Sequence, residues 1–188
     1  MSRVIGLAGA MGAGKDTVAN YLIDRHSFIR IAFADALKDD VCDRFRRTVI
    51  VIGNLNGIAK RDLTDEQYVR WLVWEVKPSG IRQLLQEYGT EVRRKEDGQY
   101  WVRAWQKRAA PWVEAGHRVV VPDVRFPNEA LAISGLGGKV WEIMRPGLPK
   151  DTHSSELPLP IIMVDQFLWN QSTVAALEEQ VANAYKLL

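Results

Sequence analysis

Short apolar runs alternate with longer stretches of helical character along this chain. The runs lie at residues 4–7, 28–32, 119–121, 140–144 and 161–164. This alternation predicts an α/β fold, because successive strands of a parallel sheet are joined by crossover helices. Strands that are buried on both faces read as continuous aliphatic segments. We therefore expect residues 119–121 and 161–164 to form central or near-central strands.

The stretch between the second and third runs is far longer than one crossover helix requires. We expect a helical insertion over about residues 35–116, set into a core of about residues 1–34 and 117–188 within a single domain. Residues 172–188 place apolar side chains on one helical face, which predicts a closing amphipathic helix.

Local signals place two helices inside the insertion. Thr64 precedes Gln67 by three residues, the spacing of a capping box at a helix start. A second helix is expected from Ser79, with its end at Gly89, because glycine is common just after a helix. Residues 48–60 fit either a hairpin or a mobile loop, and pattern alone does not choose between them.

Composition narrows the classes of protein. The chain has 188 residues, a formal net charge of +2 and one cysteine, Cys42. An internal disulfide and a paired Cys/His zinc site are therefore excluded. The small net charge argues against a stable nucleic-acid partner. The longest aliphatic segments are too short for a bilayer about 30 Å thick, so we expect no membrane partner.

A glycine-rich segment follows the first apolar run and leads into a helical face. Glycines at 9, 12 and 14 allow the backbone to curl so that successive N–H groups point at one anion, and Lys15 adds a positive charge for phosphates. Asp16 stands where this kind of loop usually has a magnesium-binding hydroxyl, and Thr17 follows it. Either residue could serve Mg²⁺. A plain glycine-rich turn with a surface lysine is the alternative.

An acidic and a basic residue follow the third run. Asp123 lies where a strand ends, a position from which a carboxylate could organise Mg²⁺, and Arg125 could neutralise charge on a phosphoryl group in transfer. Taken alone, Asp123 could equally be a helix cap.

Other side chains suit a nucleotide but also suit ordinary structure. Arg82 and Gln86 share a helical face that could hold an acceptor phosphate and a base edge, or could simply be solvated. Trp101 and Trp105 could each form an aromatic side of a nucleobase pocket or pack in the core. Arg145 could stack on a donor base. His153 and Glu156 fit a local network better than a metal site.

Together these residues resemble those of the phage-type deoxynucleoside monophosphate kinases, a branch of the P-loop nucleotide kinases. The similarity spans nearly the whole chain. It rests on residues 9–17, 33–38, 82–91, 100–102, 122–125, 128–129 and 145–147, with Thr152, His153 and Glu156. It implies a three-layer P-loop kinase core with a five-stranded parallel sheet, in which the strand bearing Asp123 lies beside the strand that feeds the loop, and a helical acceptor-binding insertion.

The resemblance also implies ligands and residue roles. ATP and Mg²⁺ would be bound by Gly12, Ala13, Gly14, Lys15, Asp16, Thr17 and Arg145, with Asp16, Thr17 and Asp123 as metal ligands. A deoxynucleoside monophosphate would be contacted by Lys38, Arg82, Gln86, Gly89, Thr90, Trp101, Asp123, Arg125 and Glu129. The catalytic residues would be Lys15, Arg82, Asp123 and Arg125. A homodimer and a cytoplasmic location, in the bacterial host if the chain is phage-encoded, are also implied.

Two other functions remain open at this point. One is an ATP-dependent kinase of another small acceptor, such as a coenzyme precursor. The other is a nucleotide-dependent nucleic-acid-binding or switch protein, suggested by the arginine clusters at residues 44–47 and 93–95. Solvated surface charge explains both clusters equally well.

Overall fold

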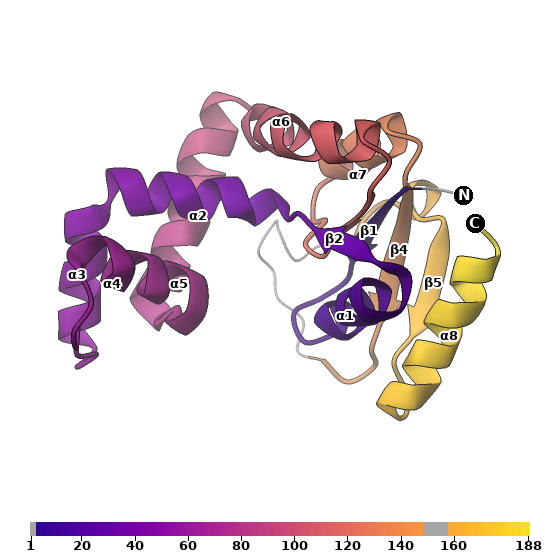
Figure 1. Ribbon diagram of the computed structural model, residues 1–188, viewed down its shortest axis with the longest axis horizontal. Helices are drawn as coiled ribbons and strands as arrows, with labels where there is room; N and C mark the ends of the chain where they lie inside the picture. Colours follow the sequence, from indigo (N-terminus) through magenta and orange to yellow (C-terminus); the bar gives the residue numbers. More distant parts are fainter. Residues whose placement is uncertain (1–2, 149–157) are drawn as a thin grey trace. The chain divides into compact units, whose positions relative to one another are not determined.

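The computed structural model describes residues 3–148 and 158–188. The chain forms two compact units (Figure 1). Residues Met1–Phe33 and Val102–Leu188 make the first, which we call the sheet unit, and Ala34–Trp101 make the second, which we call the helical unit. Among the described residues, no helix combines the length and apolar character needed to cross a membrane.

Within its described residues, the sheet unit contains five parallel strands. They are β1 (Val4–Ala8), β2 (Phe28–Arg30), β3 (Arg118–Val121), β4 (Lys139–Met144) and β5 (Gln166–Trp169). Their order is β2-β3-β1-β4-β5, and every neighbouring pair is parallel. The expected α/β fold is confirmed, and β3 lies directly beside β1.

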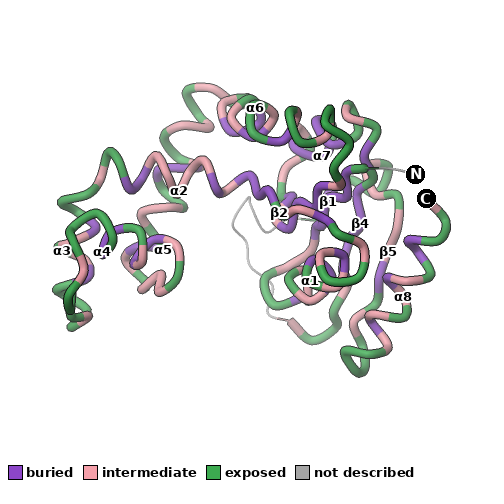
Figure 2. The backbone as a smooth tube through the Cα atoms, in the orientation of Figure 1, coloured by how far each residue is buried: buried purple, intermediate pink, exposed green. Residues whose placement is uncertain are grey.

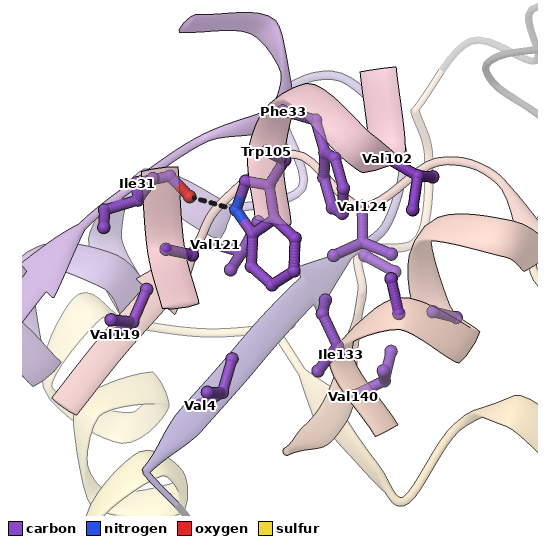
Figure 3. Close-up of a cluster of buried hydrophobic side chains, with 14 of the residues drawn as sticks. Val4, Ile31, Phe33, Val102, Trp105, Val119, Val121, Val124, Ile133 and Val140 are labelled. Carbon is purple, nitrogen blue, oxygen red and sulfur yellow. Dashed lines mark hydrogen bonds between the residues drawn. The ribbon is translucent and has the colours of Figure 1, made fainter. Parts of the chain in front are cut away.

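Helices cover both faces of this sheet. The helices are α1 (Lys15–His26), α6 (Tyr100–Glu114), α7 (Pro127–Gly135) and α8 (Val174–Lys186). In β3, Val119 and Val121 pack in a cluster with Trp105 of α6, whereas Val120 packs in the cluster that contains α1 and α8. Figure 3 shows the first cluster, where the Trp105 indole N–H donates to the Ile31 carbonyl at 3.0 Å. The run at 119–121 is therefore buried on both faces, as predicted, within three layers.

The prediction for the last apolar run was wrong. Residues Ile161–Met163 form a short 3-10 helix, η4, and Ile162 is 90% exposed. The strand begins later, at Gln166, and forms the edge of the sheet. Asp165 fixes this start, because its carboxylate accepts from the Val140 N–H at 2.8 Å. An edge strand needs few buried side chains, so β5 carries a weaker apolar signal than the run before it.

The helical unit is built from short helices. They are α2 (Phe33–Arg44), α3 (Arg46–Leu55), α4 (Asp65–Trp71), η1 (Leu72–Val76), α5 (Ser79–Gln86) and η2 (Glu87–Arg94), where α2 begins on the last residue of the sheet unit. The capping box at Thr64 and Gln67 is confirmed. Figure 2 shows buried residues on one side of several of these helices and exposed residues on the other.

Residues 48–55 are helical, so neither the hairpin nor the mobile loop is correct there. The β-branched residues between 48 and 52 favour a strand locally. Packing overrides that preference, because Val49 and Gly53, one turn apart, are both buried. Gly53 leaves no room for a Cβ beside the Tyr68 hydroxyl.

The predicted helix end at Gly89 was also wrong. The chain continues through Gly89 as a π-helix, η2, to Arg94. Gly89 is buried, and a Cβ there would lie 2.8 Å from Leu37 Cδ2. The glycine therefore permits close packing of two helices and does not end one. The helical unit contains a second π-helix, η1, and such turns occur frequently at functional sites.

Candidate functional site

The loop after β1 depends on its three glycines. Gly9, Gly12 and Gly14 have φ values of 128°, 79° and 111°, which side chains rarely allow. Neighbouring atoms also leave no room for a side chain at two of these positions. A Cβ on Gly9 would lie 2.5 Å from the Ile143 carbonyl oxygen, and one on Gly14 would lie 2.7 Å from Nδ2 of Asn170. The curl of the loop is therefore dictated by both conformation and packing.

Lys15 is the first residue of α1, and its ammonium turns back toward the loop. Its Nζ donates to the carbonyl oxygens of Gly9 and Ala10 at 2.6 and 2.8 Å. Gly14, at the helix cap, supplies no side chain to the first-turn N–H groups. A positive charge and a helix N-terminus therefore meet at the same loop, which is the arrangement that binds phosphate.

Two side chains from other segments of the chain donate hydrogen bonds to the backbone of this loop. Arg145 Nη1 donates to the Gly12 carbonyl at 3.0 Å, and Asn170 Nδ2 donates to the Ala13 carbonyl at 2.8 Å. With Pro146, Gln171 and Ser172 they line an open pocket of about 450 Å³. Arg145 directly follows β4, and its predicted stacking on a donor base stays a prediction. Asn170 was missed because the strand before it was misplaced.

The residues after β3 contribute to a second cavity. Arg125 lines a space of about 170 Å³ together with Gly9, Ala10 and Arg145. Asp123 Oδ1 accepts from the Phe33 N–H at 2.9 Å. Glu129 is buried and its Oε2 accepts from the N–H groups of Arg125 and Phe126, at 2.8 and 3.1 Å. Glu129 thus holds the backbone at the start of α7, and its predicted contact with a substrate stays a prediction.

Glu142 is a buried carboxyl that sequence reasoning overlooked. It lies in β4, is 5% exposed, and lines the same 170 Å³ cavity as Arg125. Burial raises the pKa of this carboxyl above its ordinary value. The available signal was a charged residue inside an otherwise apolar run, because a buried ionisable group with a shifted pKa that lines a cavity is a candidate site residue.

The predicted acceptor residues of the helical unit fall into an exposed and a buried set. Arg82 and Gln86 are exposed and lie one turn apart on α5. Gly89 and Trp101 are buried, and the Trp101 indole N–H donates to the Gly89 carbonyl at 2.9 Å. Trp101 therefore packs in the core of this unit and supports η2. Thr90 follows Gly89 and is half-buried.

Lys38 also lies in the helical unit, on α2. Its Nζ is 4.0 Å from the Asp35 carboxylate and 4.5 Å from the centre of the Trp74 ring. The side chain is largely buried. The ring and the carboxylate hold the ammonium in one place, which is favourable for binding an anion without a large entropy cost.

Comparison with known proteins identifies the family. The family described as "Deoxynucleotide monophosphate kinase" matches residues 57–181. The chain belongs to this family. A putative deoxynucleotide monophosphate kinase of Acanthamoeba polyphaga mimivirus is 34% identical over 192 residues, covering 95% of this chain and 93% of the relative. The deoxynucleotide monophosphate kinase of Enterobacteria phage T4 is 31% identical over 111 residues, covering 57% of this chain and 46% of the relative.

A solved structure supports the fold of this deoxynucleotide monophosphate kinase family member. Dephospho-CoA kinase from Campylobacter jejuni superposes with a TM-score of 0.50 at 12% identity, covering 99% of this chain and 96% of that one. At this identity the likeness concerns the fold alone. Family membership makes the chain a phosphotransferase and a nucleotide kinase. The resemblance read from the sequence motifs is confirmed.

Mg²⁺ would suit the oxygen atoms near the loop of this kinase. Asp16 is exposed in the first turn of α1, Thr17 follows it, and Asp123 follows β3, the neighbour of β1. Mg²⁺ prefers such oxygen ligands, one or two from carboxylates and others from the substrate's phosphates. Residues 3–148 and 158–188 contain no cluster of three or more His, Cys, Asp or Glu that could hold a metal unaided.

His153 and Glu156 lie outside the described residues.

Proposed function

We propose that this kinase transfers the γ-phosphoryl group of ATP to the 5′-phosphate of a deoxynucleoside monophosphate, giving a deoxynucleoside diphosphate and ADP. The observation that carries the proposal is the loop of residues 9–15 in a chain of this family. Lys15 donates to two carbonyls of this loop, and the two side chains that donate to other loop carbonyls line an open polar pocket.

The donor would bind along the sheet unit. Its phosphates would meet the N–H groups of residues 12–17 and the Lys15 ammonium, which is already on the inside of the loop. Its base would enter the 450 Å³ pocket, where the guanidinium of Arg145 offers a flat cationic surface.

The acceptor would be held by cationic and polar groups. In the helical unit we propose Lys38, Arg82, Gln86, Gly89, Thr90 and Trp101, of which Arg82 and Gln86 are the exposed pair on α5. In the sheet unit we propose Asp123, Arg125 and Glu129 for the acceptor and metal side. Arg125 is exposed at the 170 Å³ cavity and could contact a phosphoryl group in transfer.

The reaction would be an in-line displacement. An oxygen of the acceptor phosphate forms a bond to the γ-phosphorus while the bond to the β,γ-bridging oxygen breaks, and that oxygen leaves with ADP. The acceptor is already an anion, so no general base is required. Lys15, Arg82 and Arg125 would align the groups and neutralise charge. Bound Mg²⁺ would add charge neutralisation, and Asp16, Thr17 and Asp123 are the residues proposed to hold it.

A direct assay tests this function. ADP release from ATP and Mg²⁺ is measured with each deoxynucleoside and ribonucleoside monophosphate supplied separately, and Lys15→Ala serves as the control for contaminating kinases. Strong stimulation by one or a few deoxynucleotides, absent in the variant, is expected. If no monophosphate stimulates ADP release, the acceptor assignment is wrong, and a screen of coenzyme precursors follows.

A further inference from the structure

The loop of residues 9–15 is held by two side chains that also line the open pocket. β4 and β5 pair so that Met144 lies opposite Trp169. Arg145 and Asn170 are the first residues after these two strands, and both line the open pocket. The Asn170 N–H donates to the Met144 carbonyl at 2.8 Å, which ties the backbone of Asn170 to the end of β4.

Peptide geometry makes the contact from Asn170 important. In a trans peptide the C=O and the following N–H point in opposite directions, and this chain has no cis peptide in its described part. Because Asn170 Nδ2 donates to the Ala13 carbonyl, the Gly14 N–H of the same peptide points away from the Asn170 amide. The Asn170 amide also fills the space where a Cβ of Gly14 would be. It therefore fixes both the position and the direction of this peptide.

We propose that Asn170 is a positioning residue for phosphate binding: it orients the Gly14 N–H toward the donor phosphates while lining the pocket proposed for the donor base. This inference rests on the proposed donor site and deepens it. A base that enters the pocket contacts Asn170, and the same side chain fixes the loop that binds the phosphates. The base and the phosphates of the donor are therefore recognised through one shared side chain. Arg145, which holds the Gly12 carbonyl, acts in the same direction.

Measuring the binding of the phosphate part and of the nucleoside part of the donor separately distinguishes this role from simple contact with the base. Calorimetry measures the Kd of the full chain for inorganic tripolyphosphate with Mg²⁺, and separately for adenosine. Asn170→Asp keeps the shape of the side chain but turns an acceptor oxygen toward the Ala13 carbonyl. Asn170→Ala removes the donor without adding charge. Loss of one hydrogen bond at the loop predicts a Kd for tripolyphosphate about tenfold higher for Asn170→Ala and higher still for Asn170→Asp.

Matched controls exclude charge and folding effects. Asn183→Asp makes the same charge change at an exposed position of α8 and should leave the Kd for tripolyphosphate unchanged. If the Asn170 variants do not fold by thermal melting, Arg145→Ala, which loses the bond to Gly12, must weaken tripolyphosphate binding by itself.

Two results would contradict the inference in different ways. Weaker adenosine binding with unchanged tripolyphosphate binding would make Asn170 a base contact only, and the proposed function would stand. A parent chain that does not bind tripolyphosphate would overturn the phosphate-loop assignment itself, and the role of Asn170 with it.

Discussion

The sheet unit and the helical unit keep their elements in place by different means. Each strand of the sheet unit is hydrogen-bonded to a neighbouring strand, and two separate apolar clusters lie on the two faces of the sheet. In the helical unit a single cluster of side chains lies between short helices, two of which are π-helices. Hydrogen bonds between backbones therefore fix how the strands of the sheet unit align. In the helical unit, the shapes of the packed side chains fix how the helices lie against one another. Substitutions can test this difference.

A pair of tryptophans gives the largest expected effect. Trp105 and Trp101 are both buried and both donate to a backbone carbonyl, at Ile31 in the sheet unit and at Gly89 in the helical unit. Truncation of either to alanine is expected to cost about 3–5 kcal/mol of unfolding free energy. Hydrogen exchange should rise across the sheet for Trp105→Ala, but only in residues 34–101 for Trp101→Ala. Equal increases in β3 for both variants would show one cooperative unit.

Lys15→Ala is expected to abolish most of the activity without affecting stability. Loss of one charged group that stabilises the transition state costs about 3 kcal/mol, or roughly a hundredfold in kcat/KM. Lys15 is only partly buried and bonds to two loop carbonyls, so the melting temperature should change little. Lys186→Ala, at an exposed position of α8, is the control. A folded Lys15→Ala chain with near-normal turnover would contradict the loop assignment.

Gly89→Ala tests how tightly side-chain shape fixes the helical unit. The added Cβ would meet Leu37 Cδ2 at 2.8 Å, and overpacking of this kind costs about 1–3 kcal/mol. Gly98→Ala in the same unit meets only the Arg94 carbonyl oxygen, at 3.9 Å, and should change stability by less than about 0.5 kcal/mol. Urea unfolding measures the free energy of unfolding of both variants. If Gly89→Ala were as stable as Gly98→Ala, η2 would be free to move away from Leu37, and side-chain shape would not fix its position.

Glu142→Gln gives the smallest effect, and its sign depends on pH. The pKa of Glu142 is raised by burial, so the folded state binds the proton more tightly than the unfolded state does. The contribution of Glu142 to the free energy of unfolding is therefore fully present below the ordinary pKa of 4.5 and is lost as pH rises through the folded-state pKa. The variant should be more stable than the parent at pH 7 and equal to it near pH 4. The reverse order in unfolding experiments would mean that the carboxylate has a favourable partner.

The sheet unit was largely predictable from the sequence. Residues 4–7 and 119–121 are uninterrupted apolar runs, and 140–144 is apolar except for Glu142, because both faces of those strands are covered. The glycines at 9, 12 and 14 mark a loop that few other residues could form. The edge strand β5 was predicted at the wrong residues because it buries few apolar side chains and so has a weak apolar pattern. The exposed pair Ile161 and Ile162 resembles a strand only in composition.

The helical unit was harder to predict, and so were the contacts that refine the site. Gly53 and Gly89 serve close packing between helices, which depends on partners far along the chain and leaves no local signal. Asn170 lies more than 150 residues from the Ala13 carbonyl to which it donates, and the β1–β4 and β4–β5 pairings bring the two together. Motifs name the groups that can bind phosphate, but the tertiary fold decides which side chains support them.

The order of the strands has a consequence for how the chain folds during synthesis. Val4 of β1 pairs with Val119 of β3, so β1 leaves the ribosome long before β3 and must wait until the chain between them has been made. Residues 34–101 are contiguous and can bury their own cluster earlier. Because long-range pairing is slow and local contacts form quickly, we expect the inserted helices to fold first and to shorten the loop that the sheet must close.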